Sequence, residues 1–192
     1  MKEQVNNVCK STFLKLRNIS HIRKYLSKET TVMLVHGFIT SNIDYCNSLL
    51  SGLPMSVLKK LQMVQNAAAK LVVKARKFDH VTPILKELHW LPISYRTQCK
   101  ILLLTYKCLK GEGPEYLCNM LRPVRAMRSL RSSSKNVLMV PRTKLVTCGE
   151  RAFSVIAPVL WNELPIGVKS IENLQFFKRK LKTHLFKVAF NV

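Results

Sequence analysis

Apolar residues recur at helical spacing through most of the first 110 residues of the chain. One face of a helix over residues 4–26 carries Val5, Val8, Cys9, Thr12, Leu16 and Ile19. Positions three and four apart share a helix face, so this pattern predicts an amphipathic helix that buries one stripe. The same spacing continues downstream. It predicts helices over residues 4–26, 28–50, 55–75, 83–88, 93–110 and 114–121.

Residues that start or stop helices stand at the ends of these segments. Ser27 is the expected N-cap of the second helix, and Gly52 ends it. Proline is favoured in the first turn of a helix, where its missing N–H costs no hydrogen bond. We therefore expect further helices to start at the prolines that follow, namely Pro54, Pro83 after a Thr82 cap, Pro92 and Pro114.

The pattern changes after residue 121. Residues 137–140 and 144–147 are two short β-prone runs around a turn that contains Pro141, and they predict a small β-hairpin. Pro158 interrupts an apolar stretch and is expected to open a short helix that carries Trp161. Ser170 or Asn173 is expected to cap a last helix, which ends near Lys187.

These elements predict a mostly α fold: a bundle of about six helices, then a small β-hairpin, then a basic C-terminal helix. The expected organisation has three parts. They are a thumb-like helical bundle over 1–121, a basic Arg/Ser loop or linker over 122–135, and a small α+β segment over 136–192.

Charge narrows the choice of partner. The chain has 32 Lys and Arg against 10 Asp and Glu, a formal net charge of +22, and 47% hydrophobic residues. A core can therefore form, but self-repulsion opposes compaction unless a polyanion neutralises the charge. Nucleic acid is the usual polyanion and an anionic membrane surface is its rival. A merely soluble basic protein is the third interpretation.

The cysteines and the N-terminus indicate an intracellular protein, either nuclear or cytoplasmic. Six cysteines are scattered through apolar helical segments without a C-x-x-C pair, so we expect reduced, buried packing residues and no disulfide framework. Residues 1–10 are polar and give no signal peptide. The apolar runs are too short to span a membrane, so no membrane partner is predicted.

The sequence contains no recognisable catalytic, metal or cofactor site. Metal-dependent polymerases and nucleases need several converging carboxylates, and the only aspartates are Asp44 and Asp79. Asp79 and His80 fit a turn, where Asp bonds nearby backbone, better than an acid–base pair. No Cys/His spacing fits zinc, and no phosphate-binding or nucleophile loop occurs. We therefore expect no enzyme activity and no cofactor.

Three basic features remain as candidates for contacting phosphate. They are the outer face of helix 55–75, the Arg/Ser-rich loop 122–135 and the outer face of the last helix. Arg, Lys and Ser contact phosphate oxygens well but do not by themselves read bases. The predicted nucleic-acid-binding residues are Lys59, Lys60, Lys70, Lys74, Arg122, Arg125, Arg128, Arg131, Lys135, Lys178, Arg179 and Lys182.

An ordered series of phrases carries a family resemblance over about residues 5–186. The phrases occupy residues 43–54, 61–68, 79–83, 88–92, 100–107, 128–133, 152–165 and 177–186. Each is weak alone. In this order and spacing they resemble the C-terminal region of reverse transcriptases from LINE-type (non-LTR) retrotransposons of the jockey kind.

The resemblance implies a thumb-like region that follows the polymerase palm, whose metal-binding aspartates would precede Met1. It implies RNA or DNA as the partner, together with the palm of a parent polyprotein, and no catalytic residue in this chain. Three alternatives remain open: a docking segment without activity of its own, a non-functional relic of a retrotransposon, and an enzyme.

Overall fold

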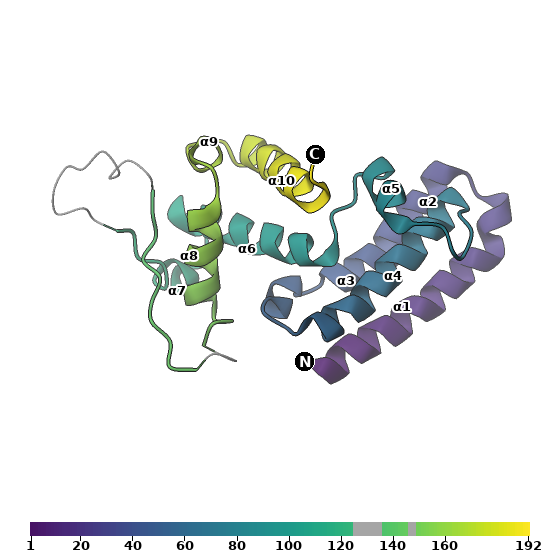
Figure 1. Cartoon of the computed structure of the whole chain (residues 1–192), viewed down its shortest axis with the longest axis horizontal. Coiled ribbons are helices and arrows are strands. Elements are labelled where there is room, and N and C mark those ends of the chain that lie inside the picture. The colour runs from purple at the N-terminus through teal and green to yellow at the C-terminus, as the bar shows by residue number, and fades with distance from the viewer. Residues whose placement is uncertain (125–135, 146–148) are drawn as a thin grey trace. The chain divides into compact units, whose positions relative to one another are not determined.

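The computed structural model describes residues 1–124, 136–145 and 149–192 (Figure 1). Arg125, Arg128, Arg131 and Lys135 of the predicted loop lie outside the described residues. Two compact units are formed, one by residues 1–97 with 188–192 and the other by residues 98–187. The sequence-based boundaries at 121 and 135 follow changes in composition, whereas these units are defined by packing.

Helices account for most of the described residues, so the expectation of a mostly α protein is confirmed. The α-helices are α1 Lys2–Ile22, α2 Lys28–Val35, α3 Ser41–Asp44, α4 Met55–Val73, α5 Val81–Glu87, α6 Ile93–Leu109, α7 Glu115–Cys118, α8 Phe153–Glu163, α9 Ile166–Lys169 and α10 Leu174–Phe190. Short 3-10 segments cover Arg23–Tyr25 and Asn47–Leu50, and a π-helical turn covers His36–Thr40.

The first unit is organised around α1 and α4, which lie side by side (Figure 1). The two helices run parallel, because Lys60 near the start of α4 bonds Asn6, and Arg23 after α1 bonds Leu71 near the end of α4. The predicted stripe of α1 is confirmed. Five of its members are buried and join the buried face of α4, namely Val5, Cys9, Thr12, Leu16 and Ile19.

The predicted helix over 28–50 is interrupted. The helical run ends at Asp44, then Tyr45 is extended and Cys46 takes a left-handed backbone conformation with φ of 53°. The Asp44 carboxylate accepts hydrogen bonds from Arg96 and, at 3.2 Å, from the Asn47 side chain. A tertiary ion pair thus fixes this turn against the local helical pattern.

Aromatic stacking dominates the core of the second unit. The Tyr106 and Phe177 rings stack at 4.1 Å between centroids, and Trp161 is tilted against Phe177 at 6.1 Å. The Tyr106 hydroxyl donates to the Glu172 carbonyl, and burial of this phenol raises its pKa. These contacts join α6, α8 and α10 within the unit.

The predicted hairpin over 137–147 is wrong. The described part of the chain contains no β-strand, although residues 146 and 147 lie outside it. Leu138 instead forms an isolated bridge with Pro123. The Asn162 side chain also binds the Leu138 N–H and carbonyl, at 2.9 and 2.8 Å. Those backbone groups are therefore occupied, and Pro141 has no N–H to offer a partner strand.

Two expectations about prolines also need correction. Pro158 lies inside α8 and does not open a helix. Its ring removes one hydrogen bond to the preceding turn, and its side chain is buried within the unit. Helix α5 begins at Val81 with His80 as its N-cap, so Thr82 is not the cap. Pro83 fits the first turn because N–H groups there have no partner within the helix.

The cap of the last helix is Asn173. Its side-chain oxygen accepts the N–H groups of Gln175 and Phe176, at 2.9 and 3.1 Å. Ser170 instead ends the short helix α9. Of the two candidates that the sequence left open, the structure selects Asn173.

Candidate nucleic-acid interface

Two adjoining shallow depressions form an open groove between the parallel helices α1 and α4. Its α1 side presents residues three or four apart, which therefore lie on one face of the helix. The same spacing recurs on α4. The residues lining it are Phe13, Leu16, Arg17, Ser20, Arg23 and Lys24 on one side, and Ala67, Lys70, Leu71, Lys74 and Ala75 on the other. We call this feature the α1–α4 groove.

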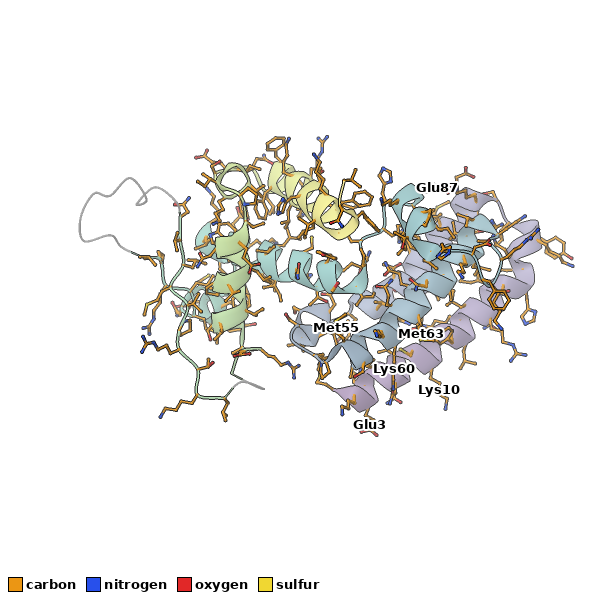
Figure 2. The ribbon with its side chains drawn as sticks, in the orientation of Figure 1. Glu3, Lys10, Met55, Lys60, Met63 and Glu87 are labelled. Carbon is orange, nitrogen blue, oxygen red and sulfur yellow. The ribbon has the colours of Figure 1, made fainter. Side chains whose placement is uncertain are left out.

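Two more lysines lie beyond the lining residues, toward the starts of the two helices. Lys10 precedes Arg17 by two helical turns, and Lys60 precedes Ala67 by the same interval. Lys60 lies on the side of α4 that borders α1, where its amine donates to the Asn6 side chain at 2.7 Å (Figure 2). Both amines are at the surface.

The charged side chains along the groove are all positive. Lys10, Arg17, Lys24, Lys60 and Lys74 are exposed, and Lys70 is half-buried. No acidic side chain occurs among the described residues that line it. Cations gathered on one face of a protein create a positive potential that attracts polyanions.

Arg23 is positioned for structure and not for ligand binding. It is buried, and its guanidinium donates to the carbonyls of Leu71, Val72 and Leu26 at 3.0, 2.7 and 2.8 Å. Two of these carbonyls belong to the last turn of α4, where partial negative charge favours a cation. Arg23 therefore fixes the end of α1 against the end of α4 and holds the groove in shape.

A second set of bonds fixes the end of α4. Lys74 ends the helix in a left-handed conformation with φ of 56°, and its N–H donates to the Leu71 carbonyl. The Lys70 amine donates to the Lys77 carbonyl at 2.5 Å. The chain thus turns sharply after α4. Residues 76–78 come next in the chain after Ala75, the last residue that lines the groove.

The structure brings together only some of the predicted residues. Lys60, Lys70 and Lys74 belong to the α1–α4 groove, and Lys59 is exposed beside Lys60 on α4. The second unit contains the rest that are described. Arg122, Arg179 and Lys182 are exposed there, and Lys178 is half-buried.

The sequence-based site left out the α1 side of the groove. Lys10, Arg17 and Lys24 follow one another at intervals of seven residues, which is close to two helical turns. That spacing places three cations on one face, and it could have been read from the sequence. What could not be read is that this face borders α4.

The second unit contains a separate, partly open pocket of about 420 Å³. Its lining includes Tyr106, Trp161 and Lys169, and Trp161 donates from its indole N–H to the Asn136 carbonyl at 2.9 Å. Burial lowers the pKa of the Lys169 amine. Such an amine can attack carbonyl compounds, but here it donates to the Asn162 carbonyl at 2.9 Å. It serves as an anchor between α8 and α9.

Other candidate chemistry is sparse in the described residues. They contain no cluster of three or more His, Cys, Asp or Glu residues that could hold a metal ion. Asp79 accepts the Arg76 N–H at 2.7 Å, as expected for a turn residue. No helix in the described ranges is long and apolar enough to cross a membrane. Cys9 and Cys108 are buried as expected, whereas Cys99 and Cys118 are half-buried and Cys46 is exposed. Cys148 lies outside the described residues.

Comparison with known proteins adds no relative: no protein-family model, no curated protein and no solved structure matches the chain.

Proposed function

We propose that the chain binds the sugar–phosphate backbone of RNA or DNA in the α1–α4 groove. The observation that carries this proposal is the groove itself, which Arg17, Lys24, Lys70 and Lys74 line, with Lys10 and Lys60 two turns nearer the starts of the two helices. We further propose that the chain represents the non-catalytic C-terminal region of a non-LTR retrotransposon reverse transcriptase. That assignment rests on the ordered phrases of the sequence.

The dimensions of the groove suit a nucleic-acid backbone. Lys60 and Lys74 are 14 residues apart on α4, which corresponds to about 21 Å of helix at roughly 1.5 Å per residue. One strand of duplex DNA carries a phosphate about every 3.4 Å along the axis. The groove therefore spans about six nucleotides, and six cations can be matched to them.

The proposed binding does not depend on sequence. Lys and Arg that contact phosphates set register and affinity, whereas base edges must be read in a groove of the nucleic acid. The groove offers amines, a guanidinium and small or apolar side chains, and these favour backbone contacts. The role proposed for the segment is to hold template and product, while chemistry belongs to the palm.

Charge reversal in the groove tests this proposal. In the variant with Arg17→Glu, Lys70→Glu and Lys74→Glu, we expect affinity for a labelled oligonucleotide to fall at least tenfold at constant salt. The matched control is Lys100→Glu, Lys110→Glu and Lys144→Glu, which changes the net charge equally at exposed positions outside the groove. Equal loss of affinity in both variants would refute a specific site.

The rival interpretation is a segment that only docks on the polymerase and has no separate activity. It predicts that neither variant changes binding, because the isolated chain would bind no nucleic acid. The same titration therefore separates the two proposals.

A further inference from the structure

Large aromatic side chains stand in solvent beside the α1–α4 groove. Phe13 lines the groove and is 43% exposed, while Tyr25 and Phe78 are 77% and 88% exposed. Single exposed apolar residues are common on protein surfaces. Here, however, the three rings accompany the cations of one groove.

Tyr25 and Phe78 follow the two sides of the groove at the same end. Tyr25 is the residue after Lys24, and Phe78 lies three residues after Ala75, and both Lys24 and Ala75 line the groove. The bond from the Lys70 amine to the Lys77 carbonyl holds the segment that carries Phe78 against the end of α4. Both rings therefore belong to the segments that leave the groove at the end lined by Lys24, Lys70 and Lys74.

Each of these two rings is paired with a lysine. The Lys24 amine lies 4.7 Å from the centre of the Tyr25 ring, and the Lys77 amine lies 5.6 Å from the centre of the Phe78 ring. These are cation–π distances. An exposed ring beside an amine offers one surface for stacking and one charge for the adjoining phosphate.

We propose that the groove takes single-stranded nucleic acid, or the junction of a single strand with a duplex, and that unpaired bases stack on Tyr25 and Phe78. This inference rests on the proposed function, because the groove must first hold the phosphates. Bases in a duplex are already stacked and cannot reach the rings. Proteins that bind single strands combine a positive groove with aromatic side chains in this way, and each stacked base adds about fivefold to 150-fold in affinity.

The test compares oligonucleotides with and without unpaired bases. A 12-nucleotide single strand of RNA or DNA and a blunt duplex of the same length are titrated against the wild-type chain and the Tyr25→Leu, Phe78→Leu variant. Leucine keeps an apolar side chain but removes the ring. Both positions are exposed, so the fold is expected to persist, and circular dichroism checks this. The matched control is Tyr116→Leu, which removes a 65% exposed ring from the second unit.

We expect the double variant to bind the single strand tenfold to 100-fold more weakly while binding the duplex as before. The control should bind both as wild type does. A Tyr25→Trp variant should lose fluorescence on adding a single strand but not on adding the duplex. Unchanged single-strand affinity, or an equal loss with the duplex, would overturn the inference and leave backbone binding intact.

Two further outcomes are distinguishable. If wild type binds neither oligonucleotide, the proposed function itself fails and the inference fails with it. Exposed aromatics beside lysines also suit an anionic membrane surface. Binding to phosphatidylserine vesicles that depends on the two rings, with no discrimination between single strand and duplex, would overturn the inference in favour of a lipid partner.

Discussion

Arg23 shows how a single buried cation can hold two helices together and shape the groove between them. Its three carbonyl partners belong to the last turn of α4 and to Leu26. Hydrogen bonds to a charged group typically contribute about 1.5–3 kcal/mol each. Losing them would also leave the carbonyls of Leu26, Leu71 and Val72 without this donor. The Arg23→Met substitution keeps an apolar stem and removes all three hydrogen bonds.

We therefore expect Arg23→Met to lower the free energy of unfolding by about 2–4 kcal/mol. Urea denaturation measures the change. The neighbouring exposed Lys24→Met is the control and should stay within about 0.5 kcal/mol of wild type. Equal stability of the two variants would show that the guanidinium does not hold α1 against α4.

The thiol of Cys108 gives a second prediction at this scale. Burial first, and then a hydrogen bond with Cys118, raise its pKa to about 11. Only the thiolate reacts with alkylating agents. At pH 8 we expect iodoacetamide to modify the exposed Cys46 rapidly and Cys108 very slowly, as read by mass spectrometry of peptides. Similar rates in the folded protein would contradict the buried, protonated state.

The raised pKa of Cys108 makes the stability of the fold depend on pH. The folded pKa of Cys108 lies above the reference value of 9.0, so folding favours the neutral thiol. Its contribution to stability is complete below about pH 9. It is lost as the pH rises through about 11.

At the scale of elements, the cap of α10 is the clearest test. Replacing Asn173→Ala removes the acceptor of two N–H groups and should lower the free energy of unfolding by about 1 kcal/mol. Ser170→Ala is the matched control, because Ser170 caps no helix start, and it should change stability by less than about 0.5 kcal/mol. A larger cost for Ser170→Ala would contradict the assignment.

Helical spacing was sufficient to place most of the long helices. The stripe of α1 and the buried face of α4 follow directly from positions three and four apart, and Gly111 follows α6 with a φ of 74°. The pattern failed where distant side chains decide the backbone. Arg96 holds Asp44 at the break before Cys46, and Asn162 holds Leu138 where a hairpin was expected.

The candidate site was predicted only in part, for a similar reason. Lys60, Lys70 and Lys74 stand out as a basic face of one helix. Arg17 belongs to α1 and Lys24 to the 3-10 segment that follows it, and only packing shows that this face adjoins α4. Net charge does not report such pairing, since it counts cations without placing them.

At the scale of the whole molecule, the net charge of +22 predicts that salt stabilises the chain. Screening shortens the range of repulsion to about 10 Å at 0.1 M salt. We expect the thermal midpoint to rise as sodium chloride increases from 20 to 200 mM. The rise should be smaller in the Lys100→Glu, Lys110→Glu, Lys144→Glu variant. A midpoint that falls with salt would mean that attractive ion pairs, and not repulsion, dominate the electrostatics.

The central claim is that the α1–α4 groove binds nucleic-acid phosphates, and the salt dependence of binding tests it most directly. Six contacts to a DNA duplex predict that the logarithm of the association constant falls with the logarithm of salt concentration with a slope of about −5. The slope should shrink by about three in the Arg17→Glu, Lys70→Glu, Lys74→Glu variant. Undetectable binding, or a slope that is near zero or unchanged by the variant, would contradict the account.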